Sequence, residues 1–387
     1  MQFFSKLSQS EISEKRFLLR ADFNVPIENG KVNDQTRILK TLPTIKKILN
    51  SNGSVAICSH LGRPNGKPNL KYSLRPVAEC LQKLLNRPVD FFPNPIEQKN
   101  LFPGKVILLQ NTRFFPEEAE NDSFFAAAIA RGTDFFINDA FGTAHREHAS
   151  NVGVANLLPN FCGLLLEKEI LVLSEVLKNP KKPLVFLVGG AKIKTKIGVL
   201  KKFAVIAEKI LIGGGIANTF LAAQDKNIGD SLFDPIEVTT AKEILQIAEK
   251  NNCQIFLPQD FVVTEKITED SNKKICQLGQ VGSNEKILDI GPKSTEKFCQ
   301  EIETAGTLVW NGPVGLFEFE NFSEGTEKIS FSSANCKGKK ILGGGDTIKA
   351  IKKFEISEDN FDHISTGGGA MLEFLEGKDL PGISVLQ

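Results

Sequence analysis

The stretch "PLVFLVGGAKIKTK", residues 183–196, contains the pattern that decides the fold. Five apolar residues, Leu184 to Val188, are followed at once by two glycines and then by a lysine-rich segment. A short and continuously apolar run is typical of a strand that is buried on both faces, as in a parallel sheet. Glycine at the end of such a strand lets the backbone come close to a ligand.

The same order of features recurs along the chain. Apolar runs alternate with amphipathic segments such as "SLRPVAECLQKLLN", residues 73–86. This alternation predicts an α/β protein whose parallel sheets are covered by helices on both faces. The predicted strands lie within residues 16–25, 54–62, 105–114, 134–142, 183–190, 209–217, 253–263, 307–315, 339–347 and 362–370.

The length of the chain indicates more than one domain. Its 387 residues exceed the roughly 250 to 300 at which a single core stops growing. Residues 164–183 read as one helix, closed by Pro180, that would connect two domains. We therefore expect two doubly wound parallel-sheet (Rossmann-like) domains, separated by a cleft and joined by a helix.

Composition excludes several classes of protein. A net charge of +1 gives no support to a nucleic-acid or membrane-surface role. No continuous run of about 18 apolar residues and no leader-like start is present, so we expect a soluble, cytoplasmic protein. The seven cysteines form no C-x-x-C pair, which favours reduced thiols over disulfides or a zinc site.

The stretch "LLRADFNVP", residues 18–26, presents three polar side chains in alternation at a predicted strand end: Arg20, Asp22 and Asn24. Alternate residues of a strand share a face, so these groups could form a site. Asp22 and Asn24 could equally form hydrogen bonds with the backbone of a turn, which Pro26 indicates. Both interpretations remain open from this stretch alone.

All nine arginines lie between Arg16 and Arg146. Codon bias in a lysine-rich chain should act on both halves, whereas a guanidinium binds phosphate or carboxylate through two parallel hydrogen bonds. Ligands of doubly wound sheets bind outside the carboxyl ends of the strands. Five arginines at or just beyond predicted strand ends therefore predict an anion site: Arg20, Arg37, Arg63, Arg113 and Arg146. His60 and either His145 or His148 could add donors, although single histidines are as often structural.

Four predicted strand ends in the second half run into glycine clusters: "VGGAKIKTK", "IGGGIANTF", "LGGGDTIKA" and "STGGGAMLE". Glycines before a helix start favour bound phosphate, so we expect a nucleotide site. The P-loop and dinucleotide signatures are absent. Lys192 and Lys196 at a helix start suit a bound anion. Asp346 could cap a helix or hold Mg²⁺ beside phosphates. "DAFG" at Asp139 lacks the H-R-D loop of protein kinases, so we assign it no metal.

Eight motifs occur in order: "RADFNVP" (20–26), "SHLGRP" (59–64), "DAFGTAHR" (139–146), "GGAKIKTK" (189–196), "GGGIANTFL" (213–221), "WNGPVGLFE" (310–318), "GGGDT" (343–347) and "STGGGAMLEFLEG" (365–377). Together they resemble the phosphoglycerate kinases, of bacterial type, over nearly the whole chain. The resemblance implies reversible phosphoryl transfer from 1,3-bisphosphoglycerate to ADP, giving 3-phosphoglycerate and ATP with Mg²⁺, by a monomer. It also implies a phosphoglycerate domain (1–163), a linker helix (164–183), a nucleotide domain (184–369) and a tail (370–387) that packs back on the first domain.

The resemblance further implies roles for single residues. Arg37 would reach the reacting carboxyl end and Lys192 would neutralise the transferring phosphoryl group, and we expect these two to be catalytic. The phosphoglycerate would be held by Asp22, Phe23, Asn24, Arg37, His60, Leu61, Gly62, Arg63, Arg113 and Arg146. The nucleotide would be held by Lys196, Gly214, Gly215, Asn311, Gly312, Glu318, Gly344, Gly345, Asp346 and Thr347, with Asp346 also on the metal. Lys194 and Glu147 depart from the family pattern and alter the local charge.

No general base stands out, and none is needed, because a carboxylate with a pKa near ~3.5 to 4 is already ionised at neutral pH. The protein would then have to align the reactants and stabilise the charge on the transferring oxygens, in a cleft that we expect to close and exclude water. Two other classes stay open. A nicotinamide-dependent oxidoreductase would have this fold class, although the chain lacks the glycine fingerprint of such enzymes. A non-catalytic two-lobed anion-binding protein would also explain the arginines.

Overall fold

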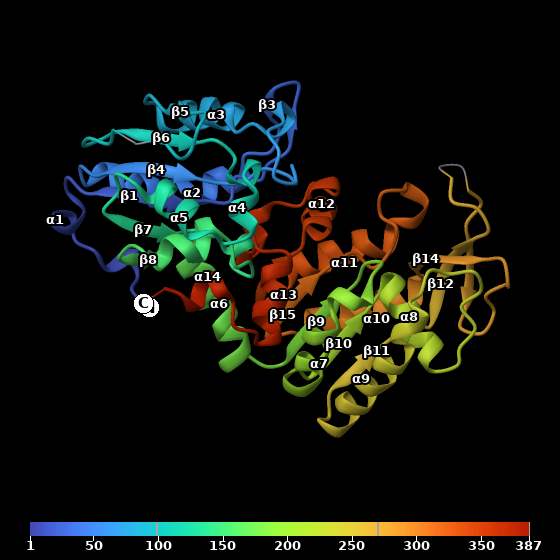
Figure 1. The fold of residues 1–387 in the computed structure, drawn as a ribbon. Helices are drawn as coiled ribbons and strands as arrows, with labels where there is room; N and C mark the ends of the chain where they lie inside the picture. Colours follow the sequence, from blue (N-terminus) through green and yellow to red (C-terminus); the bar gives the residue numbers. More distant parts are fainter. Residues whose placement is uncertain (98–99, 269–270, 387) are drawn as a thin grey trace. The chain divides into compact units, whose positions relative to one another are not determined.

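The computed structural model describes residues 1–97, 100–268 and 271–386. The chain divides into two compact units. Unit 1 comprises residues 1–171 and the C-terminal residues from Asp379, and unit 2 comprises residues 172–378. Figure 1 follows the chain through both units, from blue at the N-terminus to red at the C-terminus.

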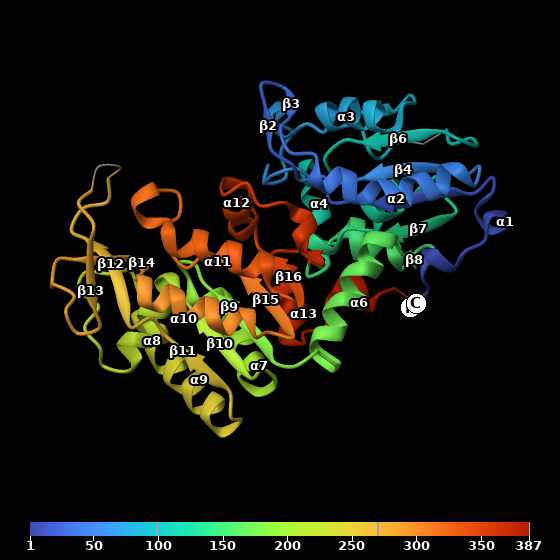
Figure 2. The same ribbon diagram turned by 180° about the vertical axis from the view of Figure 1, so that it is seen from behind.

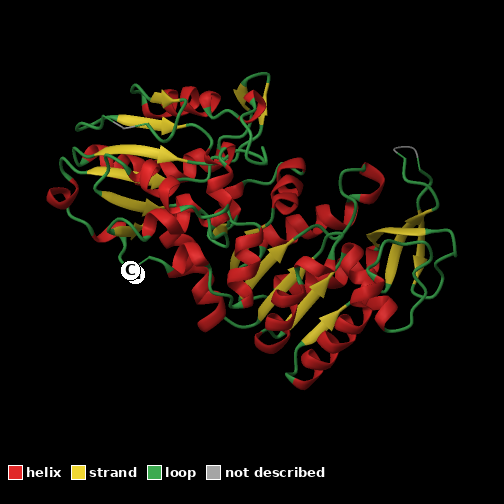
Figure 3. Cartoon of the chain, viewed as in Figure 1, coloured by secondary structure: helices red, strands yellow, loops and turns green. Residues whose placement is uncertain are grey.

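Unit 1 is built on a six-stranded sheet with strand order β5-β6-β4-β1-β7-β8. Every neighbouring pair is parallel (Figure 3). Arg20 at the end of β1 is in register with Cys58 of β4 and Asn138 of β7, so the carboxyl ends of these strands meet at one edge. The bounds are β1 Arg16–Arg20, β4 Ser54–Cys58, β5 Asp90–Phe92, β6 Val106–Leu109, β7 Phe135–Asn138 and β8 Asn160–Cys162, with a small hairpin of β2 Ile27–Glu28 and β3 Lys31–Val32.

The helices of unit 1 begin and end where the sequence provides caps. Helix α3 has a proline in its first turn and ends at Asn86, which takes the left-handed conformation with φ 49°. The regular helices are α1 Gln9–Ile12, α2 Thr36–Asn50, α3 Arg75–Leu85, α4 Pro116–Ala119, α5 Ser123–Ala130 and α14 Pro381–Ser384. Short 3₁₀ turns are η1 Phe4–Lys6, η2 Leu70–Tyr72, η3 Thr112–Phe114 and η4 Phe141–Thr143, and η5 Ala149–Gly153 is a π-helical turn.

Unit 2 repeats this plan with a second six-stranded parallel sheet, of order β11-β10-β9-β15-β16-β17. All five residues of β9 are buried, as its continuous apolar run predicts. The bounds are β9 Leu184–Val188, β10 Lys209–Ile212, β11 Gln254–Phe256, β15 Thr307–Asn311, β16 Lys339–Gly343 and β17 His363–Ile364. The predicted fold class, two doubly wound parallel-sheet units, is confirmed.

The sequence interpretation of residues 253–263 as one strand is wrong. The chain forms β11, breaks at Pro258, and then forms β12, which belongs to another sheet. Proline has no backbone N–H to donate to a sheet and fixes φ, so it ends the first strand. Strand β12 lies between two antiparallel partners that the sequence analysis did not predict, with bounds β12 Asp260–Thr264, β13 Lys274–Gln277 and β14 Lys286–Ile290.

The helices of unit 2 fall into two groups by their mutual contacts. Helix α11 contacts α10 and α12, whereas α9 contacts α7 and α8 and α7 contacts α13, as expected for helices that cover opposite faces of a sheet (Figure 2). The bounds are α7 Ile197–Ile206, α8 Gly214–Ala223, α9 Val238–Lys250, α10 Pro292–Glu303, α11 Glu324–Asn335, α12 Gly345–Lys353 and α13 Gly369–Glu376, with 3₁₀ turns η6 Ile193–Thr195, η7 Pro235–Glu237, η8 Glu320–Phe322 and η9 Glu358–Asn360.

Helix α6, Leu164–Lys178, carries the chain from unit 1 into unit 2. It is shorter than the predicted span 164–183. Asp139 fixes its start, because Oδ1 of Asp139 accepts hydrogen bonds from the backbone N–H groups of Leu165 and Leu166, at 2.8 and 3.1 Å. Asp139 of "DAFG" is therefore a helix cap.

The C-terminal segment that belongs to unit 1 is also shorter than predicted. Helix α13 packs on α7 inside unit 2 and ends at Gly377, which has φ 91°. Within this C-terminal segment, only the residues from Asp379 belong to unit 1. There the Gly382 carbonyl accepts a hydrogen bond from Nδ2 of Asn138, and the Gly382 N–H donates to the Ala144 carbonyl, both at 2.8 Å. The predicted span 370–387 thus includes a helix of unit 2, and its last residue lies outside the described ones.

Two expectations from composition concern the thiols and the membrane. All seven cysteines are free thiols, as expected. Within the described ranges, no helix combines the length and apolar character that crossing a bilayer requires.

Candidate active site

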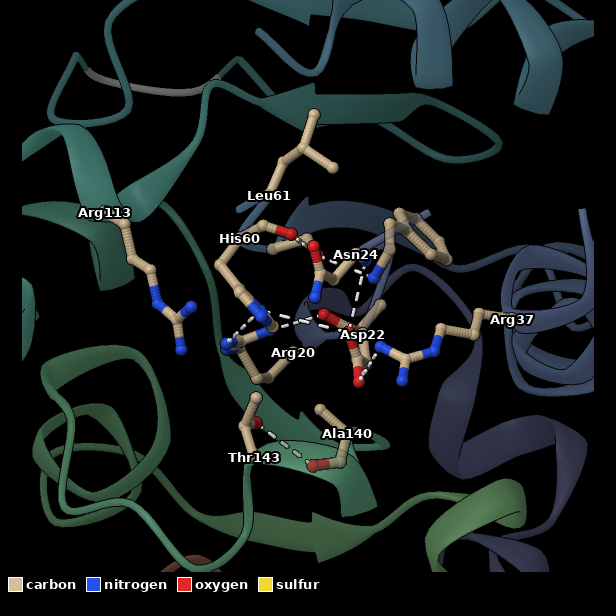
Figure 4. Close-up of polar contacts among 12 residues, drawn as sticks. Arg20, Asp22, Asn24, Arg37, His60, Leu61, Arg113, Ala140 and Thr143 are labelled. Atoms are coloured by element: carbon tan, nitrogen blue, oxygen red, sulfur yellow. Dashed lines mark hydrogen bonds and ion pairs between the residues drawn. The ribbon is translucent and has the colours of Figure 1, made fainter. Parts of the chain in front are cut away.

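Polar side chains meet beyond the carboxyl ends of β1 and β4 in unit 1 (Figure 4). Asp22 is buried and accepts a hydrogen bond of 2.7 Å on Oδ2 from Nη1 of Arg37, which lies in the first turn of α2. Nδ1 of His60 lies 3.9 Å from Oδ1 of Asp22. Arg20, also buried, lies 3.3 Å from the same imidazole nitrogen through Nη2. The Asp22 carboxylate therefore pairs with one guanidinium group and lies near a histidine, which in turn contacts a second guanidinium group.

Positive charge dominates this part of unit 1. Burial, followed by the charges of Arg20, Arg113, Arg37 and Arg146, holds the pKa of His60 well below its ordinary value. Burial and the charges of Arg20 and Arg146 likewise lower the pKa of Arg113 to about 10. His60 is therefore neutral at physiological pH, and four of the five predicted arginines lie close enough to affect it. Such a cluster suits a multiply charged anion.

The loops that carry these groups are joined by backbone hydrogen bonds. Oδ1 of Asn24 accepts from the N–H of Gly62 at 2.9 Å, and the Gly62 carbonyl accepts from Nη1 of Arg113 at 2.9 Å. Oδ1 of Asp22 accepts from the N–H of Asn24 at 3.2 Å. The turn role and the site role of Asp22 and Asn24 are therefore compatible, since each forms a local hydrogen bond within the cluster.

Two predicted substrate-binding residues have buried side chains. Phe23 and Leu61 belong to the hydrophobic core of unit 1. The N–H of Phe23 is taken by Oγ of Ser59 at 2.9 Å. The Phe23 and Leu61 side chains pack inward and support the loops, so any contact of these two residues with a ligand would be made by the backbone, and their assignment to the substrate stays a prediction.

The remaining predicted residues of unit 1 differ in exposure. Arg63 is exposed and follows Gly62 directly. Arg146 is half-buried and lines an open, polar hollow with Asn121 and His148. Nδ1 of His148 lies 3.6 Å from Oε1 of the buried Glu118.

Unit 2 contains two adjoining cavities that share Gly190, Ala191, Pro313 and Asp346. The first is mainly apolar. Its walls include the predicted residues Gly214, Gly215 and Glu318, together with apolar side chains that the sequence analysis did not identify: Leu232, Leu288, Val314 and Leu316. These come from the antiparallel sheet and its neighbouring loops, and they give a surface suited to a nucleobase.

The second cavity is lined by lysines and glycines. Lys192, Lys194 and Lys196 lie on its wall beside the acidic group of Asp346. The other predicted residues that line it are Asn311, Gly312, Gly344, Gly345 and Thr347. All ten residues predicted to bind nucleotide therefore line one or both cavities of unit 2. A nucleoside in the apolar cavity and its phosphates in the lysine cavity would match this pair of cavities.

Lys196 is the buried member of the lysine group. Its Nζ donates to the carbonyl of Gly189, after β9, and to the carbonyl of Asn311, at the end of β15 and 3.0 Å away. Burial lowers the pKa of Lys196 to about 8, although the charge of Asp346 opposes this shift. The free protein thus holds a partly deprotonated lysine where a phosphate would favour the charged form.

The geometry defines a class of protein: a two-unit α/β protein with a cluster of arginines in one unit and two adjoining cavities, one mainly apolar and one with lysines on its wall, in the other. Comparisons with known proteins identify the family. The family model for phosphoglycerate kinase matches residues 7–378. The chain is 43% identical over 388 residues to a phosphoglycerate kinase of Finegoldia magna, covering 98% of both chains. It is 46% identical over 386 residues to that of Pseudothermotoga lettingae, covering 96% of both.

Solved structures agree with the sequence comparisons. The phosphoglycerate kinase of Coxiella burnetii superposes with a TM-score of 0.90 at 42% identity, covering 99% of this chain and 98% of the other. That of Pyrococcus horikoshii OT3 gives a TM-score of 0.84 at 31% identity, covering 100% and 98%. The chain belongs to the phosphoglycerate kinase family, phosphotransferases that act on a carboxyl group, and the resemblance inferred from the motifs is confirmed.

Proposed function

We propose that unit 1 binds 3-phosphoglycerate or 1,3-bisphosphoglycerate, that unit 2 binds ATP or ADP, and that a phosphoryl group passes reversibly between them. The observation that carries the substrate assignment is the arginine cluster around neutral His60. Arg37 is paired with Asp22. Among the described residues, no carboxylate lies within ion-pair distance of Arg63, Arg113 or Arg146.

The charge of this cluster suits the proposed ligand. A phosphate monoester carries about −1.5 to −2 at neutral pH, and a carboxylate adds one more negative charge. Arg113 and Arg146, which act on His60, would offset two units of that charge, and we assign a third to the exposed Arg63. They also supply the paired N–H donors that phosphate and carboxylate oxygens accept.

The nucleotide assignment is supported by the two cavities. The apolar cavity offers Leu232, Val314 and Leu316 to a base, and the adjoining cavity offers five lysines and glycine backbone to phosphates. Gly214 and Gly312 have positive φ values of 63° and 98°. This conformation brings their backbone to the cavity wall without a side chain in the way.

The chemistry needs alignment and charge stabilisation from this chain. The attacking carboxylate is ionised at neutral pH and needs no base. We assign Arg37 to the carboxyl end of the phosphoglycerate and Lys192, exposed on the wall of the lysine cavity, to the charge on the transferring oxygens. The reacting atoms must come within about 3 to 3.5 Å in line. The closed cleft that would bring this about stays a prediction.

The residues of the lysine cavity fit Mg²⁺ that arrives with the nucleotide. Within the described ranges, no group of three His, Cys, Asp or Glu side chains could hold a metal by itself. Mg²⁺ commonly takes one or two carboxylates and completes its shell with phosphate oxygens and water. Asp346, exposed in the first turn of α12, would supply the carboxylate. The ion would supply charge neutralisation at the phosphates.

A coupled assay tests the proposal. The purified chain is given 3-phosphoglycerate and MgATP, and a downstream dehydrogenase reports 1,3-bisphosphoglycerate through NADH consumption. We expect turnover that depends on both substrates and is strongly reduced in Arg37→Ala. A folded protein that binds ATP without turnover would refute the proposal. The net charge of +1 gives no support to a nucleic-acid or membrane-surface partner. We further propose that the chain acts on its small-molecule substrates in the cytoplasm as a monomer, and sedimentation would test the oligomeric state.

A further inference from the structure

Glu118 is a fully buried carboxylate to which the proposed chemistry gives no role. It lies on the short helix α4, which contacts both η3 and η5. Oε1 of Glu118 accepts hydrogen bonds from Oγ1 of Thr112, in η3, at 3.1 Å, and from Oγ of Ser150, in η5, at 2.6 Å. Oε2 accepts from the backbone N–H of Ser150 at 3.0 Å. One side chain therefore ties two loops together.

Each tied loop carries an arginine of the cluster. Arg113 follows Thr112 in η3. Arg146 precedes η5, and Asn151 of η5 donates from Nδ2 to the carbonyls of Arg146 and Thr143, at 3.4 and 2.9 Å. The backbone that carries Arg146 is thus held by the turn that Glu118 anchors.

Glu118 is also connected to the buried arginine of the cluster. Arg20 donates from Nε to Oγ of Ser150 at 2.8 Å, and that hydroxyl donates to Glu118. Burial would raise the pKa of Glu118, but His148, Arg20 and Ser150 outweigh it, and the net shift is downward. A carboxylate kept ionised in the interior requires such partners.

We propose that Glu118 is a positioning residue for the phosphoglycerate: it sets the spacing of Arg113 and Arg146 by holding both of their loops. It does so without contact with the substrate. The proposal rests on the assignment of these two arginines to the phosphoglycerate.

Two other roles of Glu118 make different predictions. If Glu118 only offsets positive charge, its neutralisation would strengthen the attraction for an anion and lower the KM for 3-phosphoglycerate. If it only stabilises the fold, its loss would lower the unfolding temperature and leave both KM values unchanged. A positioning role raises the KM for 3-phosphoglycerate alone, because a phosphate bound by two arginines is sensitive to their separation.

The test uses Glu118→Gln, Ser150→Ala and the control Glu117→Gln, an exposed carboxylate on the same helix. A glutamine side chain has one accepting oxygen where glutamate has two, so Glu118→Gln removes the charge and cannot accept all three of these hydrogen bonds, at nearly constant size. Ser150→Ala removes one hydroxyl and leaves every charge in place. KM values for 3-phosphoglycerate and MgATP are measured separately, beside the unfolding temperature.

We expect the KM for 3-phosphoglycerate to rise about tenfold in Glu118→Gln and about threefold or more in Ser150→Ala. The KM for MgATP should stay within about twofold, and Glu117→Gln should match the parent protein. If Glu118→Gln does not fold, Ser150→Ala decides the question by itself. Unchanged or lower KM values for 3-phosphoglycerate in the folded variants would overturn the positioning role.

Arg113→Ala separates this failure from failure of the proposed function. If Arg113→Ala raises the KM for 3-phosphoglycerate and the Glu118 and Ser150 variants do not, the substrate site stands and the positioning role is wrong. If Arg113→Ala itself leaves that KM unchanged, the substrate assignment and the positioning role both fail.

Discussion

Arg37 and Asp22 form an ion pair, with Nη1 of Arg37 2.7 Å from Oδ2 of Asp22. Asp22 follows β1 and its side chain is 6% exposed, whereas Arg37 begins α2 and its side chain is 33% exposed. The buried carboxylate thus holds one end of a guanidinium that is partly exposed. An arginine held in this way loses less side-chain entropy when it binds a ligand.

This pair leads to the first prediction, on Arg37→Ala. If Arg37 stabilises charge that develops at the carboxyl end of the substrate, its removal should lower kcat about 10²-fold, as for other lost donors of this type. Steady-state rates at saturating substrates measure the effect. Arg131→Ala, an exposed arginine of the same unit, is the control and should keep the parent rate. Near-parent turnover in Arg37→Ala would exclude the catalytic role.

A second prediction compares two lysines of the same cavity. Lys192 and Lys194 are both exposed on its wall, two residues apart. If Lys192 contacts the transferring phosphoryl group, Lys192→Ala should lower kcat about 10²-fold. Lys194→Ala removes the same charge and should cost about tenfold or less, mostly in the KM for the nucleotide. Equal losses in kcat would show that only the overall potential of the cavity matters.

The third prediction concerns Gly345, at the start of α12. A Cβ built on Gly345 meets no atom within 4 Å, and its φ is not positive, so the fold itself would accept alanine. The cavity would not, because the added methyl group lies where phosphates are expected. We expect Gly345→Ala to keep or raise the unfolding temperature and to raise the KM for ADP several-fold.

Gly104→Ala provides the contrast to Gly345→Ala. Gly104 is in unit 1 and has φ 80°, and a Cβ added there meets no atom within 4 Å, so alanine is strained by its backbone alone. It should destabilise the fold by about 1 kcal/mol or more. The KM for ADP should not change. If Gly345→Ala binds ADP normally, the glycine cluster after β16 does not approach the phosphates.

Local patterns were sufficient to predict the parts of the site that lie at strand ends. The end of β1 carries Arg20 and the end of β9 carries the glycines, and parallel pairing places such ends at one sheet edge. The antiparallel sheet was missed because β13, with the pattern Lys-Ile-Cys-Gln, is short and largely exposed. Such a strand has little apolar signal of its own and depends on its partner β12.

The polar residues that support the site could not be predicted. Glu118 follows another glutamate in "PEEA" and reads as a surface residue, yet it is fully buried because Ser150, 32 residues later, supplies its hydrogen bonds. Asp289 is similar: it is a buried residue beside the first cavity, and its carboxylate accepts a hydrogen bond from the N–H of Gly325, 36 residues later. Burial of a charge is decided by partners distant in sequence, which periodicity does not reveal.

A fourth prediction concerns the pH dependence of stability through Asp139, the cap of α6. Burial raises the pKa of Asp139 to about 7 against the opposing hydrogen bonds from Thr44, Leu166 and Leu165. The folded state therefore binds more protons than the unfolded state between about pH 4 and 7, and stability falls as pH rises through this range. Asp139→Asn keeps the Oδ1 acceptor and removes the titration. The urea midpoint of the variant minus that of the parent should therefore be larger at pH 8 than at pH 5.

The control for Asp139→Asn is Asp134→Asn, in the same unit. The hydrogen bond from Arg16 lowers the pKa of Asp134, so its stabilising contribution is present at both pH 5 and pH 8 and is lost only in stronger acid. Its midpoint should therefore shift equally at the two pH values. A parallel shift in Asp139→Asn as well would mean that Asp139 remains ionised throughout.

The fifth prediction is proton uptake when nucleotide binds. Burial lowers the pKa of Lys196 to about 8, so about half of the free protein is deprotonated there at pH 8. Phosphates next to Nζ would raise that pKa, and the complex should take up about half a proton at pH 8 and about a tenth at pH 7. Calorimetric titrations with MgADP in buffers of different ionisation enthalpy measure this number.

Lys196→Arg decides whether Lys196 is the group that takes up the proton. Arginine stays protonated in the free protein, so the variant should bind MgADP with no dependence on the buffer at pH 8. The same titration affects stability, since a lysine with a lowered pKa favours the folded state more as pH rises from about 8 toward 10.5. The free parent protein should therefore gain stability over that range relative to Lys196→Arg. Uptake that persists in Lys196→Arg would assign the proton to another group.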